Sequence, residues 1–322
     1  MKSAVAVSDL VVEYTTSRGR IRALDSAALL VGFGETVSVV GESGSGKSTL
    51  GLSIGKILPT SARRLSGDVR VNGVSVFDLG TDSLRALRRE SLGFIFQNPI
   101  AALDPTMRIR DQMRAVAPSE RLADLFNLVG LKDALRVGRS YPHELSGGMA
   151  QRVMIAMALA RQPRIIIADE PTASLDSTAK ATVLDILFQR ARETSATVLL
   201  LTHDLRSVSR YCDKVAVMYA GRTVEFGSTR LLFSQPQHPY TRALMAAAPG
   251  AEHAQGTLRP IPGTPPVLRG TSPGCAFADR CHLAIARCRI ERPELRLVGG
   301  LRVACHLAPT GQRSITETKS WG

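Results

Sequence analysis

The segment Val37–Thr49 constrains the fold more than any other part of the chain. It reads VSVVGESGSGKST, an apolar run followed by the pattern G-x4-G-K-S, and a helical pattern comes next. Glycines let the backbone wrap closely around an anion, and the N-terminus of the following helix adds partial positive charge. A strand, a glycine-rich loop and a helix in this order predict a phosphate-binding loop in an α/β domain. The alternative is a Gly/Ser-rich turn that happens to end in lysine.

Each polar residue of this loop has an expected role. The Lys47 ammonium is expected to contact the β- and γ-phosphates of a bound nucleotide, and the Ser48 hydroxyl is expected to ligate Mg²⁺. The backbone N–H groups are expected to surround the phosphates. The predicted nucleotide-binding residues of the loop are Gly41, Ser43, Gly44, Ser45, Gly46, Lys47, Ser48 and Thr49.

A second motif places two carboxylates at the end of a buried strand. Residues Ile165–Glu170 read IIIADE. The carboxyl ends of strands in open α/β sheets are where ligands bind, so Asp169 is expected to hold Mg²⁺, through water. Glu170 is the natural general base for the attacking water. The alternative, an Asp-Glu pair that caps a helix before Pro171, is disfavoured because the phosphate loop agrees with the catalytic interpretation.

Periodicity indicates how the rest of the chain is organised. The first 77 residues read mostly as strands, with hairpin turns at Ser17–Arg20 and at Asn72-Gly73, and the phosphate loop and its helix, Lys47 to about Leu58, lie within them. Residues 98–162 turn helical and are interpreted as a helical insertion. Strands alternating with helices resume at residue 164. After Pro249, dense Gly and Pro indicate a linker into a separate small module.

Composition limits the classes of protein that fit. The chain has 322 residues, of which 44% are hydrophobic and 21% charged, as in ordinary globular proteins. No apolar run approaches the roughly 18 residues that span a bilayer. The net charge of +13 is high and would suit a surface that faces nucleic acid or anionic lipid. Since no Lys/Arg block of five or more occurs, a general excess of arginine is the favoured explanation.

Residues Leu145–Arg152 read LSGGMAQR and lie upstream of the acidic strand. With the phosphate loop and that strand, this motif makes the chain resemble the ATP-binding subunit of an ABC transporter. The resemblance implies an α/β fold, a phosphate-loop (RecA-like) ABC ATPase core with an antiparallel β subdomain and a helical insertion. It also implies an ATPase domain over 1–250, with the helical subdomain at about 98–162, and a small C-terminal module over 251–322.

The resemblance extends to further site residues. In the family, the LSGG serine and glycines bind the γ-phosphate of ATP held by a second subunit, so two cassettes close head to tail around two ATPs. Those positions here are Ser146, Gly147 and Gly148, and Asp176 resembles the aspartate that couples the two sites. The motif departs from the commoner LSGGQ at Met149, which leaves the serine and the glycines in place.

Three more positions match family residues that lie near the γ-phosphate or the adenine ring of ATP. Gln97, in FQNP, matches the glutamine that senses Mg²⁺ and the attacking water, and His203 matches the switch histidine that contacts the γ-phosphate. Tyr14 is the expected adenine-stacking residue, with Ile21 or Arg22 as the alternative if the alignment slips. The expected catalytic residues are thus Glu170, His203 and Gln97, and the expected Mg²⁺ site comprises Ser48, Gln97 and Asp169.

Three segments resemble one branch of this family. FQNPIAALDP (Phe96–Pro105) is similar to the glutamine segment of peptide importers, with Asp104 in place of Asn. QPQHPYTRAL (Gln235–Leu244) is similar to their HPYT segment. The segment from Gly274 to Leu307 resembles the C-terminal module of oligopeptide, dipeptide and nickel importer ATPases.

Four cysteines fall within that module. Cys275, Cys281, Cys288 and Cys305 follow the spacing C-x5-C-x6-C-x16-C, whereas Cys212 lies apart. Four thiolates in a module with little core could hold a [4Fe–4S] cluster, with zinc as the second choice. Some relatives carry such a cluster at matching cysteines. The alternative is four free thiols that pack as small hydrophobic groups.

The resemblance implies an ATPase subunit, with ATP and Mg²⁺ as cofactors, of an importer for peptides or related small solutes. Expected partners are two transmembrane permease subunits, a second ATP-binding subunit (a paralogue rather than an identical copy) and, indirectly, an extracytoplasmic solute-binding protein. The expected location is the cytoplasmic face of the inner membrane. A nucleic-acid or ribosome ATPase is the alternative, supported only by the +13 charge. A redox-sensing role of the cysteine module could coexist with transport. The sequence does not identify the cargo, and peptides, nickel chelates, opines and glutathione all stay open.

Overall fold

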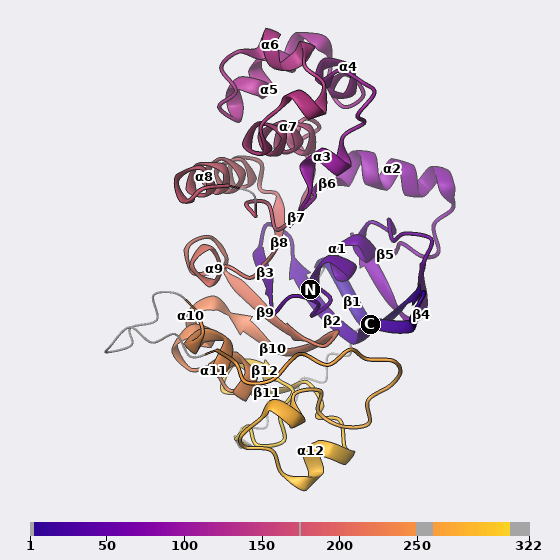
Figure 1. Ribbon diagram of the computed structural model, residues 1–322, viewed down its shortest axis with the longest axis vertical. Coiled ribbons are helices and arrows are strands. Elements are labelled where there is room, and N and C mark those ends of the chain that lie inside the picture. Colours follow the sequence, from indigo (N-terminus) through magenta and orange to yellow (C-terminus); the bar gives the residue numbers. More distant parts are fainter. Residues whose placement is uncertain (1–2, 174, 249–259, 310–322) are drawn as a thin grey trace. The chain divides into compact units, whose positions relative to one another are not determined.

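The computed structural model describes residues 3–173, 175–248 and 260–309. It divides into two compact units, described separately here (Figure 1). Unit 1 comprises residues 1–31, 36–78 and 202–322, and unit 2 comprises residues 32–35 and 79–201. Most of the linker expected after Pro249 (residues 249–259) and the polar tail at 310–322 lie outside the described residues.

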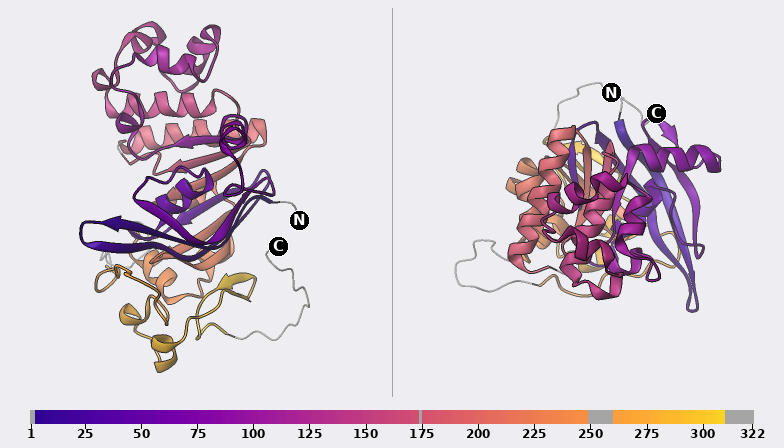
Figure 2. Two further views of the ribbon diagram at one scale, coloured as in Figure 1. Left: turned by 90° about the vertical axis from the view of Figure 1, so that its right-hand side faces the viewer. Right: turned by 90° about the horizontal axis from the view of Figure 1, so that it is seen from above.

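Unit 1 contains an antiparallel sheet in the order β2-β1-β4-β5. Its strands are β1 (Ser3–Thr16), β2 (Gly19–Gly32), β4 (Ala62–Val71) and β5 (Val74–Ser75). Apolar residues alternate along β1, so that Val5, Val7 and other side chains on one face are fully buried. Figure 2 shows β1 and β2 as a long paired ribbon in indigo.

Both hairpin turns predicted in this region are confirmed. β1 and β2 are joined by a turn directly before Gly19. Asn72 and Gly73, with φ values of 53° and 83°, join β4 to β5. Two successive positive φ values match the twist of an antiparallel hairpin, which is why Asn-Gly is favoured there.

The mixed sheet of unit 1 supports the phosphate loop. The parallel strands β3 (Thr36–Val40) and β9 (Lys214–Tyr219) pair with Val40 opposite Val217. Strand β10 (Arg222–Ser228) continues the sheet antiparallel to β9. The C-terminal strands β12 (Leu301–Val303) and β11 (Arg296–Val298) extend it beyond β10, so the C-terminal segment adds two strands to its edge.

The helices of unit 1 are short. The helix after the phosphate loop, α1, ends at Ile54, earlier than the predicted Leu58, because Lys56 adopts a left-handed conformation with φ of 50°. The others are α9 (Leu205–Tyr211), α10 (Thr229–Ser234), α11 (Pro239–Ala246) and α12 (Ala286–Ile290), with a 3₁₀ turn at Ala278–Arg280.

Unit 2 contains three parallel strands and most of the helices. The strands are β6 (Leu92–Ile95), β7 (Ile165–Asp169) and β8 (Thr197–Thr202), in the order β8-β7-β6. The predicted helical region contains α3 (Pro99–Ala102), α4 (Ile109–Arg114), α5 (Leu122–Leu128), α6 (Ala134–Arg139) and α7 (Gly147–Leu159), with 3₁₀ turns at Ser119–Arg121 and Pro142–Glu144. Helix α8 (Ser177–Thr194) lies between β7 and β8, in the region where strands were predicted to alternate with helices.

One helix of unit 2 has no counterpart in the sequence prediction. Helix α2 (Thr81–Ser91) precedes β6 and buries only Leu84. Its sequence, TDSLRALRRES, is too polar to give a clear apolar periodicity, although Asp82 near its start and Arg88 and Arg89 near its end favour a helix. Within the described residues, no helix is both long and apolar enough to cross a membrane.

Candidate nucleotide-binding site

The phosphate loop has the predicted strand–loop–helix arrangement. Strand β3 ends at Val40, and α1 (Lys47–Ile54) begins six residues after Gly41. Within the loop, the Ser45 N–H donates to the Glu42 carbonyl at 3.1 Å. The Ser45 carbonyl in turn accepts from the Gly221 N–H at 2.9 Å, so the turn after β9 supports the loop from beneath.

Gly46 is required by its surroundings as well as by its conformation. It has φ of 101°, a left-handed value that residues with a side chain adopt at a cost. A Cβ there would lie 2.6 Å from the Ala23 carbonyl oxygen and 2.9 Å from the Leu24 side chain. The glycine therefore allows the loop to turn directly against β2.

The Lys47 side chain, which starts from the first residue of α1, lies along the loop. Its ammonium donates to the Gly41 carbonyl at 2.8 Å and to the Glu42 carbonyl at 3.1 Å, and the residue is 8% exposed. The lysine is thus held along the loop, at the position that a phosphate-binding lysine needs. Ser48 is half-buried on the first turn of α1, and Ser43 and Gly44 are exposed at the tip of the loop.

Tyr14 lies beside this loop. Its hydroxyl is 3.3 Å from the Thr49 hydroxyl, which brings β1 against the first turn of α1. Of the three residues considered for adenine stacking, Arg22 makes an ion pair with Glu13 at 2.8 Å. That ion pair gives the Arg22 side chain a structural partner, and adenine stacking by Tyr14 stays a prediction.

In unit 2, the acidic strand has the predicted form. Asp169 is the last residue of β7 and pairs with Leu201 of β8. Glu170 adopts φ of 45°, and its N–H donates to the Leu201 carbonyl at 2.8 Å. A left-handed conformation at a glutamate costs of the order of 1–3 kcal/mol, and such strain is typical of functional positions.

Gln97 follows the neighbouring strand. Ile95 of β6 pairs with Ala168 of β7. Gln97 lies two residues beyond Ile95, and Asp169 lies one residue beyond Ala168, so both residues lie at the same edge of the sheet. The intervening Phe96 N–H donates to the Met154 sulfur at 2.9 Å, and Gln97 is exposed. The glutamine and the acidic pair therefore leave the sheet at one edge.

The LSGG motif begins helix α7. Ser146 caps α7, and its hydroxyl accepts from the Met149 N–H at 3.2 Å. Asp176 caps α8 in the same way and accepts from the N–H groups of Thr178 and Ala179 at 3.0 and 2.9 Å. The hydrogen bond from Ala179 lowers the pKa of the Asp176 carboxyl, so it is ionised at neutral pH.

Both caps line one surface pocket of unit 2. Its lining includes Ser146, Gly148, Arg152, Leu175 and Asp176. A Cβ on Gly148 would lie 3.2 Å from the Leu175 side chain, so glycine keeps this pocket open. A helix N-terminus beside an arginine is suited to an anion.

His203, the remaining catalytic candidate, is exposed directly after β8, and Asp204 beside it caps α9.

The four cysteines of the C-terminal module line one small cavity. Cys275, Cys281, Cys288 and Cys305 surround it with His306 and Phe277. Burial raises the pKa of the Cys275 thiol to about 11, and the other three cysteines contribute by charge repulsion. The four sulfurs therefore lie within electrostatic reach of one another. Cys212 is buried elsewhere, and burial raises its pKa to about 12.

The cavity does not contain a ligand set for a single ion. Among the residues that the structure describes, no three His, Cys, Asp or Glu side chains are grouped closely enough to hold one metal ion. Tetrahedral zinc requires four ligands at about 2.0–2.3 Å, so this arrangement supports neither the expected [4Fe–4S] cluster nor the runner-up, zinc.

Three residues near the phosphate loop were not singled out from the sequence. Glu42 of the loop makes an ion pair with Arg280 of the C-terminal module at 2.7 Å, and its N–H donates to the Tyr240 hydroxyl at 2.9 Å. Tyr240 and Arg280 lie within the HPYT and C-terminal segments named above, and the signal for Glu42 was an acidic residue in a loop that binds anions. Such a residue needs a cation nearby, but nothing in the sequence identifies which one.

Comparison with known proteins agrees with these motifs. Residues 24–173 match the family described as "ABC transporter". Residues 224–288 match the family described as "Oligopeptide/dipeptide transporter, C-terminal region". The second match includes the HPYT segment and three of the four module cysteines.

Several relatives are similar over nearly the whole chain. A putative peptide import ATP-binding protein of Brucella abortus is 40% identical over 93% of this chain and 93% of its own length. The dipeptide transport ATP-binding protein DppD of Bacillus subtilis is 39% identical over 89% of each. The oligopeptide transport ATP-binding protein OppD of Mycobacterium tuberculosis is 40% identical, and the chain spans about half the length of that relative (50%).

Solved structures show the same fold. The ATP-binding cassette MJ0796, in a dimeric post-hydrolysis state bound to ADP and Pi, has a TM-score of 0.63 and 29% identity. That match covers 70% of this chain and 99% of the cassette. CbiO1 of Clostridium perfringens, part of the transporter complex CbiONQ, has a TM-score of 0.60 and 28% identity over 73% of this chain and 92% of its own length. The expected α/β cassette fold is confirmed, and the chain belongs to the ABC transporter ATPases, in the family that includes the oligopeptide and dipeptide transport ATP-binding proteins.

Proposed function

We propose that this chain binds and hydrolyses ATP to drive an importer of peptides or related small solutes. The observation that carries the proposal is the phosphate loop, in which Lys47 is held over the carbonyls of Gly41 and Glu42 beside Tyr14 and Thr49. The import of peptides rests on the Brucella and Bacillus relatives, which are described as peptide import and dipeptide transport proteins.

In this proposal, the polar side chains divide the chemistry among them. Lys47 and the loop N–H groups bind the phosphates, and Ser48, Asp169 and Gln97 hold Mg²⁺, directly or through water. Mg²⁺ supplies positive charge to the phosphoryl group. Glu170 accepts a proton from the attacking water, and His203 orients that water and contacts the γ-phosphate.

A second cassette completes the site. The pocket formed by Ser146, Gly148, Arg152 and Asp176 presents a capped helix N-terminus and an arginine. We propose that it receives the γ-phosphate of ATP bound by a second subunit, a paralogue in preference to an identical chain. The dimeric MJ0796 cassette is a related example of such an assembly.

The remaining partners follow from the family. Two transmembrane permease subunits would bring this chain to the cytoplasmic face of the cell membrane, and a solute-binding protein would act on the permeases from the other side. The cargo could be a peptide, a nickel chelate, an opine or glutathione, because the ATPase subunit does not contact it.

The Glu170→Gln variant tests the chemistry. It keeps the shape of the side chain but cannot accept the proton, so we expect ATP to bind while turnover falls by about 10²–10⁴-fold. Glu193→Gln is the matched control, because that glutamate is exposed near the end of α8 and, within the described residues, pairs with Arg190 and Gln189 of its own helix. Turnover like that of the wild-type protein in Glu170→Gln would reject Glu170 as the base.

Purification of the tagged Glu170→Gln variant from its host tests the partners. Recovery of two multi-spanning proteins from gently solubilised membranes, with or without a second ATPase, would support an importer. Recovery of nucleic acid or ribosomes in a salt-sensitive manner would favour the alternative.

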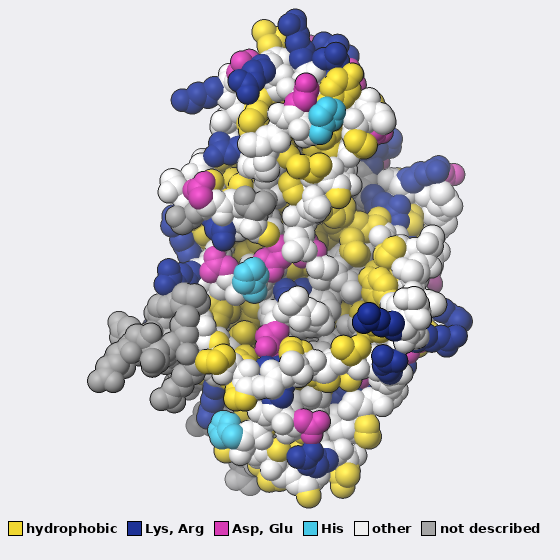
Figure 3. Space-filling model, viewed as in Figure 1, with side chains coloured by type: hydrophobic (Ala, Val, Ile, Leu, Met, Phe, Trp, Pro, Cys, Tyr) yellow, Lys and Arg dark blue, Asp and Glu magenta, His cyan; other side chains and the backbone are white. Residues whose placement is uncertain are grey.

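On the face drawn in Figure 3, Lys and Arg side chains are spread among acidic and uncharged ones, which argues against a single nucleic-acid surface there.

We further propose that the four module cysteines hold an iron–sulfur cluster. The support for this proposal is the chemistry of the donors, because four thiols line one cavity and thiolates are the usual ligands of [4Fe–4S] clusters. Such a group would cross-link a module that has little regular structure. The family comparisons neither require nor exclude it.

Iron analysis tests this point. Anaerobically purified protein is expected to contain about four irons per chain and to absorb broadly in the visible range. Cys288→Ser should lose the iron, whereas Cys212→Ser, which alters a buried cysteine outside the cavity, should keep it. Zinc in place of iron would support the second choice, and metal-free protein from anaerobic cells would indicate free thiols.

A further inference from the structure

The phosphate loop contains an acidic residue whose partner comes from the far end of the chain. Glu42 follows Gly41, and both of its carboxylate oxygens accept from the Arg280 guanidinium, at 2.7 and 3.1 Å. The Arg280 side chain is 6% exposed and that of Glu42 is 25% exposed. A bidentate (two-pronged), largely buried ion pair of this kind is stronger and more directional than a surface ion pair.

Arg280 is held in one position by several further contacts. Its Nε donates to the Pro262 carbonyl at 2.7 Å, and its Nη1 donates to the Tyr219 hydroxyl at 3.2 Å. The guanidinium carbon lies 5.7 Å from the centre of the Tyr219 ring and 5.9 Å from that of Phe277. The hydrogen bonds to Glu42, more than any other contact, raise the pKa of Arg280 above its ordinary value. The guanidinium is therefore pre-positioned and permanently charged.

Glu42 connects this arginine to the nucleotide-binding lysine. Its N–H donates to the buried Tyr240 hydroxyl at 2.9 Å. Its carbonyl accepts from the Lys47 ammonium at 3.1 Å and from the Ser45 N–H at 3.1 Å. The side chain of Glu42 is thus fixed by the C-terminal module while its backbone forms part of the phosphate loop.

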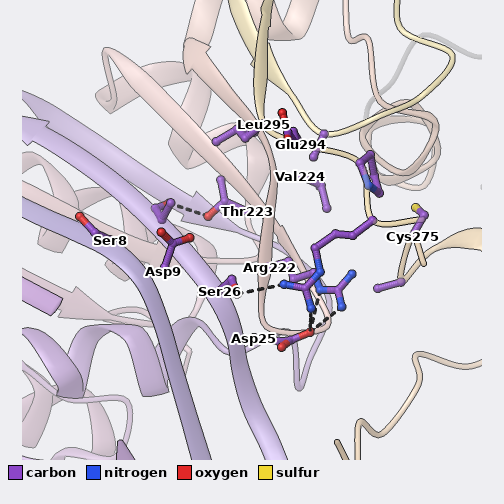
Figure 4. Close-up of a pocket in the computed structure, with 15 residues that line it drawn as sticks. Ser8, Asp9, Asp25, Ser26, Arg222, Thr223, Val224, Cys275, Glu294 and Leu295 are labelled. Carbon is purple, nitrogen blue, oxygen red and sulfur yellow. Dashed lines mark hydrogen bonds and ion pairs between the residues drawn. The ribbon is translucent and has the colours of Figure 1, made fainter. Parts of the chain in front are cut away.

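The C-terminal module has a second anchor, which keeps Arg280 in place. We call it the Asp25 cluster: Asp25 with Arg22, Arg222 and Arg292. Arg222 binds Asp25 through Nε at 2.8 Å and donates to the Gly274 carbonyl at 2.7 Å. Figure 4 shows Asp25 below the Arg222 side chain, with Cys275 of the module close by. Arg280 therefore acts from a module that is tied to the sheet, not from a loose tail.

The electrostatic consequence concerns ATP. The phosphate loop must accept a ligand with three or four negative charges, and an unpaired carboxylate in that loop would repel it. Arg280 neutralises this carboxylate and links it to the C-terminal module. We propose that Arg280 is a positioning residue for nucleotide binding, through which the C-terminal module sets the affinity of the phosphate loop for ATP. This role rests on the proposed binding of ATP and does not depend on the identity of the cargo.

Titration of the full chain with a fluorescent ATP analogue tests the proposal. Arg280→Ala is expected to weaken binding by about fivefold to tenfold, because it leaves a carboxylate unpaired beside the phosphates. ADP, which carries less charge, should be affected less. Arg280→Lys, which keeps the charge but not the two-pronged geometry, should fall between Arg280→Ala and the wild-type protein.

The double variant Glu42→Gln/Arg280→Ala separates charge from general damage. It removes the unpaired carboxylate, so binding should recover to within about twofold of the wild-type protein. Arg287→Ala is the matched control, because Arg287 lies in the same module and pairs with exposed Glu291. It should bind ATP like the wild-type protein.

Three outcomes would overturn the proposal. They are wild-type affinity in Arg280→Ala, an equal loss in Arg287→Ala, and no recovery in the double variant. If Arg280→Ala does not fold, Arg280→Lys and the double variant still decide the matter. An intermediate loss in Arg280→Lys together with recovery in the double variant supports the role, and wild-type affinity in Arg280→Lys overturns the requirement for the two-pronged pair.

Discussion

Two carboxylates of unit 1, Asp25 and Glu42, are both held by arginines, and the contrast between them is instructive. The Asp25 side chain is 1% exposed and contacts Arg22, Arg222 and Arg292. The Glu42 side chain is 25% exposed and, among the arginines that the structure describes, contacts Arg280. Asp25 is an interior charge at the junction of β2, β10 and the C-terminal module. Glu42 lies in the loop that receives phosphate. The same chemistry therefore stabilises the fold at one position and adjusts a ligand site at the other.

Asp25→Asn should give the largest effect on stability. Three arginines would then converge on a neutral amide, and breaking a buried ion-pair network costs about 3–5 kcal/mol of unfolding free energy. Denaturant unfolding measures this loss. ATP affinity of the folded protein should fall by less than in Arg280→Ala, because the cluster helps to hold the C-terminal module but does not contact the phosphate loop through its side chains.

Asp279→Asn is the control for that prediction. Asp279 pairs with Arg289 at 2.6 Å, but its side chain is 86% exposed, so its loss should cost at most about 1 kcal/mol. Equal stability losses in Asp25→Asn and Asp279→Asn would contradict the interior role of Asp25. A loss of ATP affinity in Asp25→Asn as large as that in Arg280→Ala would erase the distinction between the two carboxylates.

Tyr240→Phe should give a smaller effect, which lowers both the stability of the protein and its affinity for ATP. The ring, which lies 4.6 Å from Tyr219 and 5.3 Å from Phe277 between ring centres, would keep its packing. The Glu42 N–H would lose its acceptor, which costs about 1–3 kcal/mol if no other partner replaces it. Unfolding and ATP titration on the same samples should show lower stability and a weaker affinity, by less than in Arg280→Ala. Unchanged values in both measurements would show that the Tyr240 hydroxyl does not hold the loop.

Arg287→Ala should give the smallest effect. Arg287 and Glu291 form a pair on α12 in which both side chains are at least half exposed. Such pairs contribute about 0.3–0.5 kcal/mol, so the unfolding free energy should change by no more than this amount. A larger change would mean that the module depends on its surface pairs, and the contrast with Asp25 would then lose its basis.

Much of the fold could be predicted because its signals are local. The Asn72-Gly73 turn, the helix cap at Ser146 and the strand ending at Asp169 each follow from a few adjacent residues. Helix α2 was missed because only Leu84 is buried, so its apolar periodicity is weak. The early end of α1 at Ile54 depends on the backbone of Lys56, which the apolar pattern does not report.

The sequence by itself determined the phosphate loop, the acidic strand and the LSGG helix, because each consists of contiguous residues whose roles depend on their spacing. The tertiary structure decided which arginine neutralises Glu42, because Arg280 lies 238 residues later in the chain. It likewise decided that four cysteines spread over 31 positions face one cavity. Contacts between distant segments depend on how β-strands and loops pack together, and the sequence contains no local record of that packing.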